Sequence, residues 1–482
     1  MDLDDIRVRL MEGHGECIYD IIKDYNEVID KLKLIASKLN AKVITLYEKN
    51  NTAEVLIREV SEDKCIDVRI CVCGNVDAGK STLVGVLTTG EKDNGRGSAR
   101  TKIFKHKHEQ ETGRTSAISY RSIGFDCNSK TTNYDHETFR ITDKKQMTAN
   151  SSKLVTLYDL AGHEKYLKTT LFGMSSSTPD YAMIVISANN GIQRMTKEHI
   201  CICLALKLPF FVVVTRIDAC PKNIFDVTIE NIKKLVKAAS VCKLPYIING
   251  DDGVIISAKN LKDDKIVPII CLSSVTHENV PLLQKLLNLV PIRKNWNLLA
   301  QEPIECVIDS IYQVPGIGLV VAGIVSKGCI CVNDYVNIGP DRQGKYKQVQ
   351  IKSIHINNIN KKKAEAGKVA AFSLSKYKGN LHVRKGMVLL DTRIKPTFTW
   401  EFKAEIKILY HTTTIQVGYQ PVIHSSSVKQ SATIISIEGG KILRTGGKAI
   451  VTFKFLYRPE YLMSAGKIVL RENKTRGIGH LI

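Results

Sequence analysis

The stretch VCGNVDAGKST, residues 72–82, matches the pattern G-x-x-x-x-G-K-[ST]. Glycines at the two fixed positions let the backbone curl so that its N–H groups surround a diphosphate. The lysine of the pattern places a positive charge on the β- and γ-phosphates, and the hydroxyl group that follows it ligates Mg²⁺. The stretch therefore predicts a phosphate-binding loop made of Gly74, Asn75, Val76, Asp77, Ala78, Gly79, Lys80, Ser81 and Thr82.

The segments around this loop support the prediction. A glycine-rich turn can match the pattern by chance, but residues 67–73 (DVRICVC) are typical of a buried strand. Residues 82–87 start an amphipathic helix, and its N-terminus would face the bound anion. Further apolar runs predict parallel strands covered on both faces, with helical segments between several of them, at residues 154–160, 180–187, 209–215 and 267–273.

A second motif, DLAGHE at residues 159–164, stands at the end of the apolar run 154–160. Asp159 can hold Mg²⁺ through a water molecule, and the N–H group of Gly162 can donate to a γ-phosphate. His163 follows directly, within reach of a water molecule that attacks this phosphate. A lone histidine is more often a structural or surface residue, but this position favours a catalytic role in orienting water.

A third motif, TRID at residues 215–218, predicts recognition of the base. The carboxylate of Asp218 can accept from both N1–H and N2–H₂ of guanine, which selects guanine over adenine. The usual motif begins with Asn-Lys, whereas this chain has Thr215 and Arg216. Arg216 can still stack its flat guanidinium on the base. Thr215 lacks an amide group, so we expect an effect on nucleotide affinity more than on specificity.

A fourth motif should be a Ser-Ala-x-type loop whose backbone N–H groups contact the guanine O6. Two segments qualify, and the first, Ser257-Ala258-Lys259, matches the usual letters better. The second is followed by residues 279–289, a predicted helix well suited to close the domain. We favour the second segment, which consists of Ser273, Ser274 and Val275.

A long polar stretch separates the phosphate-binding loop from Asp159. Within its segment ETGRTS, residues 111–116, we predict Thr115 as the second hydroxyl ligand of Mg²⁺, ordered only with a triphosphate bound. The polar composition of residues 126–152 predicts a flexible insertion. The stretch also contains basic side chains with no acidic residue among them: Arg96, Arg100, Lys102, Lys105, His106, Lys107 and His108.

Length and composition limit the class of protein. A chain of 482 residues is too long for one core, and no apolar run reaches membrane-spanning length. Residues 1–10 carry acidic side chains where a signal peptide needs positive charge. The 13 cysteines include no C-x-x-C pair, which argues against a zinc site or a disulfide framework. We therefore expect a cytoplasmic protein that does not bind a membrane.

The changing pattern along the chain predicts its domains. We expect an α/β P-loop GTPase domain at residues 67–296, preceded by a small α+β N-terminal unit at residues 1–66. Beyond residue 296 the pattern changes to short alternating strands with Gly, Asn and Asp turns. These strands predict two antiparallel β-barrels, at residues 297–396 and 397–482.

The positive charge is concentrated in the predicted barrels. Residues 301–482 contain 27 Lys and Arg against 12 Asp and Glu, and thus hold most of the formal net charge of +21. Such an excess can be a solvated surface without a partner. It also fits an electrostatic footprint for a nucleic acid backbone.

The four motifs, in this order, resemble those of the translation elongation factor class of GTPases. Segments of the barrels support the resemblance, among them VPGIGLVVAG at residues 314–323 and GGKILRTGGKAIV at residues 439–451. More narrowly, GNVDAGKSTLVGVLTTGEKDNGRG, KHKHEQETGRTSAI and DLAGHEKYLKTTLFGM are similar to the family of GTP-binding proteins 1 and 2. The similarity reaches the N-terminal unit through RVRLMEGHGECIYDI.

The resemblance implies GTP and Mg²⁺ as cofactors, GTP hydrolysis, and delivery of aminoacyl-tRNA or a related RNA toward the ribosome. It also links the chain with mRNA surveillance and decay, and it does not identify a nucleotide exchange factor. In elongation factors the third domain contacts the tRNA stem near the segment that matches residues 471–476 here. Arg471, Lys474 and Arg476 are therefore candidates for RNA contact, although solvated turn charges would look the same.

One departure from elongation factors concerns an apolar gate that restrains the catalytic histidine. Those proteins generally have an isoleucine before the switch threonine, whereas this chain has Arg114; the other gate position keeps Val76. We hypothesise that Arg114 slows hydrolysis in the resting state by pairing elsewhere, or that it contributes charge to the transition state.

Two other functions compete with an elongation-factor-like GTPase. The chain could be an RNA-binding adaptor in mRNA decay, with GTP as a mainly structural ligand. The presence of both Asp159 and His163 argues against this, because a silent site needs no water-orienting histidine. A GTPase subunit that drives a metabolic enzyme is the third alternative, and the basic barrels favour RNA over it.

Overall fold

The computed structural model describes most of the 482 residues. The described residues are 3–22, 24–49, 51–60, 65–102, 118–136, 138, 140–176, 178–239, 241–357, 359–375, 382–426, 428–440, 442–463, 466–472 and 475–482. They form two compact units. The first consists of residues 1–170 and 179–294, and the second of residues 171–178 and 295–482.

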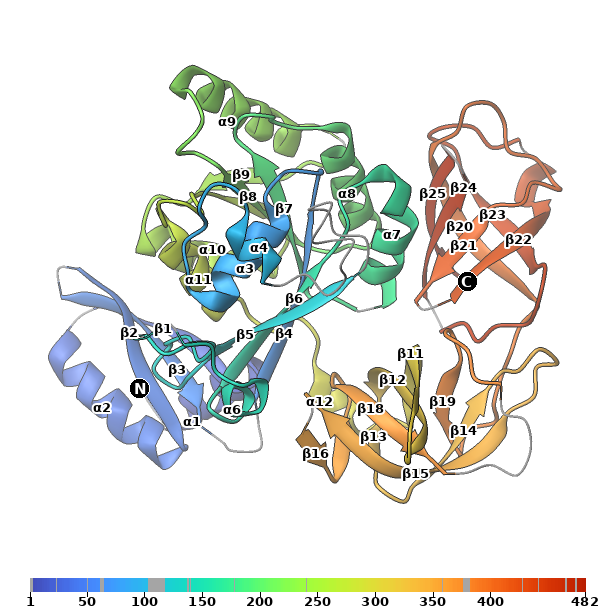
Figure 1. The fold of residues 1–482 in the computed structure, drawn as a ribbon, viewed down its shortest axis with the longest axis horizontal. Helices are drawn as coiled ribbons and strands as arrows, with labels where there is room; N and C mark the ends of the chain where they lie inside the picture. Colours follow the sequence, from blue (N-terminus) through green and yellow to red (C-terminus); the bar gives the residue numbers. More distant parts are fainter. Residues whose placement is uncertain are drawn as a thin grey trace. The chain divides into compact units, whose positions relative to one another are not determined.

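A seven-stranded sheet forms the centre of the first unit (Figure 1), in the order β5-β6-β4-β7-β8-β10-β9. Its neighbours are parallel except for β5, which runs antiparallel to β6 at one edge. The strands are β4 (Ile66–Gly74), β5 (Ser119–Phe125), β6 (Lys153–Asp159), β7 (Tyr181–Ser187), β8 (Phe210–Thr215), β9 (Leu244–Ile247) and β10 (Ile266–Cys271).

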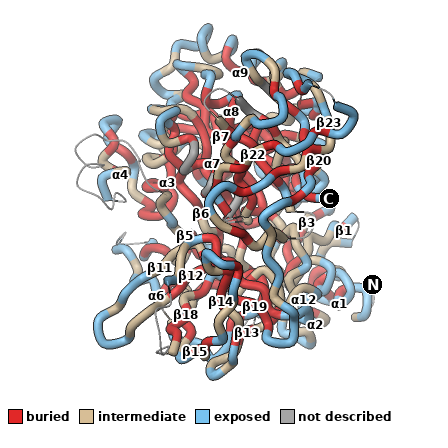
Figure 2. Tube along the Cα trace, turned by 90° about the vertical axis from the view of Figure 1, so that its right-hand side faces the viewer, coloured by how far each residue is buried: buried red, intermediate tan, exposed pale blue. Residues whose placement is uncertain are grey.

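The interior strands are buried on both faces, as their apolar sequences predict. Every residue of β7 and of β8 is buried, and successive side chains of a strand point to opposite faces, so both faces are covered. Figure 2 shows β6 and β7 in the buried part of the trace. The helices along this part of the chain are α3 (Lys80–Thr89), α4 (Ser98–Thr101), α6 (Lys144–Ala149), α7 (Leu167–Ser176), α8 (Arg194–Ala205), α9 (Lys222–Lys237), α10 (Asp251–Leu261) and α11 (Val280–Leu289), with the 3₁₀ turn η1 (Glu164–Tyr166). Residues 171–176 of α7 belong to the second unit.

The polar residues 126–152 are ordered where the structure describes them, which corrects the expectation of a flexible insertion. The side chain of Asn133 accepts from the Gly124 N–H at 2.8 Å and donates to the Ser122 carbonyl at 2.8 Å. Met147 on α6 is buried at 5% exposure. Polar composition misled the prediction here because polar side chains can hydrogen-bond to the backbone, in place of the backbone–backbone bonds of a regular sheet.

The N-terminal residues form an α+β layer within the first unit. Its antiparallel sheet has the order β1-β3-β2, with strands β1 (Glu16–Ile21), β2 (Ala41–Lys49) and β3 (Thr52–Glu59). Helices α1 (Leu3–Glu12) and α2 (Tyr25–Lys38) pack on it through a core that includes Ile6, Leu10, Leu32, Ala36, Val55 and Ile57.

The second unit contains two antiparallel β-structures, as predicted. The first has the order β14-β19-β11-β12-β18-β15-β16, and an added β14–β15 pairing closes six of its strands into a ring. Its strands are β11 (Glu305–Val314), β12 (Gly318–Lys327), β14 (Tyr335–Gly339), β15 (Lys347–Ile356), β16 (Ile359–Lys361), β18 (Val369–Leu374) and β19 (Val388–Asp391), beside the pair β13 (Cys329–Cys331) and β17 (Lys363–Glu365) and the short helix α12 (Trp296–Leu299).

The second β-structure is a closed barrel in the order β20-β23-β22-β21-β24-β25. Its strands are β20 (Glu401–Tyr410), β21 (Val422–Ser425), β22 (Val428–Ile437), β23 (Lys448–Phe455), β24 (Lys467–Glu472) and β25 (Thr475–Leu481), with the 3₁₀ turn η2 (Glu438–Gly440). All 13 cysteines of the chain are free thiols. Among the described residues, no helix combines the length and the apolar character needed to cross a membrane.

Candidate functional site

The predicted phosphate-binding loop leaves β4 and enters α3. Gly79 directly before α3 has φ 84°, and Asp77 has φ 60°, so the chain turns through left-handed conformations. Gly74 has φ 149°, and a Cβ there would lie 2.3 Å from the Val185 carbonyl oxygen. Glycine is thus required at one end for packing against β7 and at the other for the turn. The first turn of α3 leaves N–H groups available to an anion.

Lys80 lies deep in this loop. Its side chain is 6% exposed, and its Nζ donates to the Asn75 carbonyl at 2.8 Å. Burial lowers the pKa of Lys80, and the charge of Asp159 opposes that shift. An anion next to Nζ would favour the charged form further, so the ammonium is suited to a phosphate partner.

Ser81, in the first turn of α3, and Asp159, at the end of β6, bring two oxygen ligands together. The Ser81 hydroxyl donates to Asp159 Oδ2 at 2.6 Å, and Asp159 is 1% exposed. Hydroxyl and carboxylate oxygens are ligands that Mg²⁺ prefers, so this pair fits that ion. The described residues hold no group of three or more His, Cys, Asp or Glu that could bind a metal. Phosphate oxygens and water would therefore complete the coordination. Thr115, the other predicted ligand, lies outside the described residues, as does Arg114.

Gly162 and His163 follow β6 and reach the same loop. A Cβ on Gly162 would lie 2.5 Å from Lys80 Nζ and 2.7 Å from the Gly74 carbonyl oxygen, so only glycine allows this approach. His163 is exposed and precedes η1, and its Nδ1 accepts from the Lys165 N–H at 3.1 Å. In the neutral ring the proton therefore lies on Nε2.

Thr215, the last residue of β8, also contacts the phosphate-binding loop. It is 2% exposed. Its hydroxyl donates to the Ala78 carbonyl oxygen at 2.8 Å. The threonine thus supplies a hydrogen bond to the phosphate-binding loop without an amide group. Arg216 is exposed with φ 61°, and Asp218 is exposed.

The segment 273–275 directly follows β10, at the same end of the sheet. Ser273 Oγ accepts from the N–H groups of Val275 and Thr276, each at 3.1 Å. The Ser274 carbonyl accepts from the Asp93 N–H at 3.0 Å. These bonds give the segment a fixed turn beside the loop that follows α3.

The alternative segment 257–259 lies inside α10. Ser257 is completely buried, and Lys259 pairs with Asp20 at 2.5 Å and Glu54 at 2.6 Å, both in the N-terminal layer. A residue inside a helix has its N–H committed to the helix. This segment is therefore not placed to contact a base at the strand ends.

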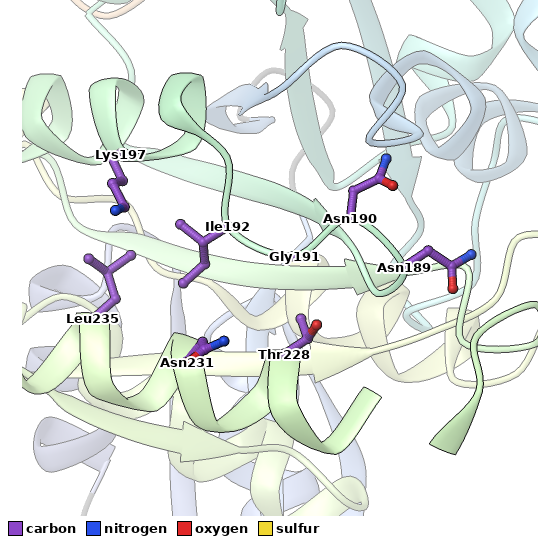
Figure 3. Close-up of a pocket in the computed structure, with 8 residues that line it drawn as sticks. All are labelled: Asn189, Asn190, Gly191, Ile192, Lys197, Thr228, Asn231 and Leu235. Atoms are coloured by element: carbon purple, nitrogen blue, oxygen red, sulfur yellow. The ribbon is translucent and has the colours of Figure 1, made fainter. Parts of the chain in front are cut away.

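Two cavities lie near these elements in the first unit. The larger, about 420 Å³, is bordered by the loop after β7, the start of α8 and the face of α9. In Figure 3, Thr228, Asn231 and Leu235 project from α9 toward residues 189–192. It contains none of the predicted nucleotide residues. The smaller cavity, about 50 Å³, gathers part of them and is the candidate site; it is lined by Val76, Asp77, Gly79, Lys80, Ser81, Thr82, Arg100, Gly162, His163 and Arg216. Asp159, Thr215, Asp218 and residues 273–275 are not among its lining residues.

Two residues at this site were not predicted. Arg100 lines the smaller cavity, although the sequence marked it only as part of a basic stretch. His199 on α8 is completely buried, and its Nδ1 accepts from the Gly74 N–H at 3.1 Å. No pattern in the sequence pointed to His199, because the contact joins positions far apart in the chain.

The candidates for RNA contact belong to the second unit. Arg471 on β24 is 9% exposed, so little of its guanidinium reaches solvent. Arg476 pairs with it on β25 in the strand register, and the structure does not describe its side chain. Lys474 lies outside the described residues.

The family of elongation factor Tu GTP binding domains matches residues 67–292. The chain is 42% identical to GTP-binding protein 1 of Xenopus laevis, over 99% of this chain and 75% of the relative. It is 38% identical to GTP-binding protein 2 of Homo sapiens, over 98% of this chain and 82% of the relative. The structure of translation elongation factor SelB from Methanococcus maripaludis, in complex with the GTP analogue GppNHp, has the same fold. Its TM-score is 0.59 at 18% identity, covering 87% of this chain and 79% of that one.

Proposed function

The chain belongs to the family of GTP-binding proteins 1 and 2, which are elongation-factor-like GTPases. On that premise we propose that the protein carries aminoacyl-tRNA or a related RNA to the ribosome. Hydrolysis of bound GTP would then release the RNA. The observation that carries this proposal is that Lys80, Ser81 and His163 line one cavity, with Asp159 hydrogen-bonded to the Ser81 hydroxyl. Residues for phosphate, metal and water are then within one site.

The phosphate end of the site would hold the β- and γ-phosphates by N–H groups of the loop at residues 75–82 and by the ammonium of Lys80. Ser81 and Thr115 would ligate Mg²⁺ directly, and Asp159 would hold it through water. Bound Mg²⁺ neutralises charge on the β- and γ-phosphate oxygens. The Gly162 N–H would donate to the γ-phosphate, so that loss of this phosphate frees the segment after β6.

His163 would orient the water that attacks the γ-phosphorus, which yields GDP and inorganic phosphate. The bond that Nδ1 accepts from Lys165 leaves Nε2–H available to donate to a water oxygen. Its exposure allows a ribosomal partner to move the ring into place. Arg114 would modulate this step; if Arg114→Ile left basal and ribosome-stimulated rates unchanged, that role would be excluded.

The base end would read guanine through Asp218, with Arg216 stacked on the ring and the N–H groups of residues 273–275 on O6. Asp218→Asn tests this assignment, because an amide can donate to the C2 carbonyl of xanthine but cannot accept from two guanine donors. The variant should lose GTP affinity and gain XTP affinity. A variant that binds GTP as tightly as the parent would exclude Asp218.

The hydrolytic role is tested with His163→Ala in the full chain. The variant should bind a fluorescent GTP analogue with parental affinity and lose ribosome-stimulated hydrolysis by about a hundredfold or more. Lys165→Ala is a matched control, since it changes a neighbouring exposed side chain and keeps the backbone donor to His163. Retained stimulation in His163→Ala would remove this histidine from the mechanism.

A second function, an RNA-binding adaptor in mRNA decay, is favoured by one observation. The basic excess lies in residues 301–482, so RNA affinity need not depend on turnover at the nucleotide pocket. Release of bound tRNA is compared with GTP and with a non-hydrolysable analogue. Release with GTP alone supports the switch, and equal retention with both nucleotides supports the adaptor.

A further inference from the structure

Arg100 lies outside the four nucleotide motifs and lines the nucleotide cavity beside Lys80, Gly162 and His163. Its side chain is half-buried, and a Cβ on Gly97 would lie 2.5 Å from its Nε, so the side chain packs over its own loop. Throughout the described ranges of the chain, no carboxylate pairs with its guanidinium. The pocket therefore contains a positioned cation that forms no ion pair with any described residue.

One buried carboxylate shapes the loop that carries Arg100. Asp93 is 6% exposed, and its Oδ2 accepts from the N–H groups of Gly95 at 2.9 Å and Gly97 at 3.1 Å. Its Oδ1 accepts from the Ala99 N–H at 3.0 Å. The backbone is thus fixed up to the residue before Arg100, which reduces the entropy lost when the side chain binds a ligand.

The same loop is fastened to α3 and to the segment that follows β10. A Cβ on Gly85 would lie 2.4 Å from the Ala99 carbonyl oxygen, so glycine lets α4 pack directly on α3, and Figure 1 shows the two side by side. The Asp93 N–H donates to the Ser274 carbonyl oxygen at 3.0 Å. The loop therefore joins the two predicted ends of the nucleotide site.

We propose that Arg100 binds the phosphate chain of the guanine nucleotide, as a second cation beside Lys80. This proposal rests on the proposed function of the cavity. A nucleoside di- or triphosphate carries several negative charges, and a single lysine neutralises one of them. The guanidinium fork fits two phosphate oxygens at once, whereas an ammonium acts as a point charge. The anion would supply the ion-pair partner that Arg100 lacks among the described residues.

The test compares Arg100→Ala with Arg96→Ala in the full chain, by binding of fluorescent GDP and of a non-hydrolysable GTP analogue. Arg96 belongs to the same loop, but it is exposed and does not line the cavity. Arg100→Ala should weaken binding by about tenfold or more, as loss of a charge-assisted hydrogen bond does. Arg100→Lys should recover part of the loss, and Arg96→Ala should have little effect.

Loss of affinity for both nucleotides, or for the GTP analogue alone, supports the proposal. Unchanged affinity, or a loss no larger than that of Arg96→Ala, overturns it. Thermal unfolding of the nucleotide-free variants checks that they are folded. If Arg100→Ala is not folded, Arg100→Gln is used in its place. Lys80→Ala is measured in parallel. If Lys80→Ala loses binding while Arg100→Ala does not, only the arginine fails; if Lys80→Ala also binds normally, the nucleotide site itself fails.

Discussion

The hydroxyl of Thr215 donates to the Ala78 carbonyl oxygen across 2.8 Å and joins the end of β8 to the phosphate-binding loop. The segment predicted to read the base is thereby tied to the segment predicted to hold the phosphates. A Cβ on Gly79 would lie 3.5 Å from the same hydroxyl oxygen, which is ordinary contact distance. The short Thr215 side chain thus holds the base-reading segment close to the phosphate-binding loop.

Thr215→Val should weaken nucleotide binding because valine keeps the shape and removes the donor. Ala78 is 3% exposed, so its carbonyl oxygen would lose a partner in a buried place, at a cost of about 1–3 kcal/mol. The dissociation rate of fluorescent GDP should rise, and thermal unfolding of the nucleotide-free chain should begin earlier. Thr215→Ser keeps the hydroxyl and is the control. Equal GDP dissociation from the valine and serine variants would contradict this role.

His199 should support the first glycine of the loop from outside the motif. Its Nδ1 accepts from the Gly74 N–H at 3.1 Å, and His199→Phe would leave this buried donor unsatisfied. We expect faster GDP release by about tenfold, measured by stopped-flow displacement. His199→Gln offers an amide oxygen and should restore part of the affinity. If the phenylalanine variant released GDP at the parental rate, the bond would have no part in shaping the loop.

The parts of the site that the sequence predicted are those whose spacing is dictated by the ligand. Residues 74–82 must surround a diphosphate, so their pattern is fixed along the chain. The bond from Gly74 to His199 joins residues 125 positions apart, and only the fold brings them together. The sequence shows that Arg100 is basic, but it does not show that Arg100 lines the cavity, because that position depends on the turn around Asp93.

The fold was predictable for similar reasons. Strands β7 and β8 are apolar on both faces, so their sequences mark them clearly. The edge strand β5 has the sequence SYRSIGF, and β9 has only four residues. Neither segment has a hydrophobic pattern that distinguishes a strand from a loop. Residues 126–152 were misjudged because hydrogen bonds such as those of Asn133 stabilise a polar segment without an apolar pattern.

A buried charge cluster connects the N-terminal layer to the central sheet. One carboxylate, Glu16, contacts Lys153 Nζ at 2.5 Å and Arg58 Nη2 at 2.7 Å, and Arg58 also donates to Asn288 Oδ1 at 2.9 Å. Both cations are completely buried. Burial lowers the pKa of Lys153 to about 8, and the carboxylate of Glu16 opposes this shift.

Glu16→Gln should destabilise the first unit strongly, because two buried cations lose the carboxylate charge that both contact. Breaking a buried ion pair costs about 3–5 kcal/mol, measurable as a lower urea midpoint. Adding Lys153→Met removes one of the two buried charges left without a partner and should recover part of the stability. If the double variant were as unstable as the sum of the two single variants, the three groups would not be coupled.

Asp391 should make the stability of the second unit depend on pH in acid. Its carboxylate accepts from Arg393 Nε at 2.9 Å and Nη2 at 2.6 Å, and from the backbone N–H of Ile304 at 3.3 Å. The hydrogen bonds from Arg393 are the main reason that the pKa of Asp391 falls to about 2. An unfolded aspartate has a pKa of about 3.9, so the folded state binds the proton less tightly than the unfolded state.

This depressed pKa fixes the sign of the effect. The stabilising contribution is complete above about pH 5 and is lost progressively as the pH falls toward about 1, below both pKa values. We expect it to be about 2 kcal/mol at most, since the Arg393 side chain is 79% exposed to solvent. The difference in unfolding free energy between the parent and Asp391→Asn should therefore be present at pH 7 and shrink below about pH 5. Arg393→Ala should reproduce most of this difference, because the substitution removes the hydrogen bonds that the Arg393 side chain donates to Asp391. A difference that stays constant from pH 7 to pH 2.5 would show that Asp391 acts through packing and not through its charge.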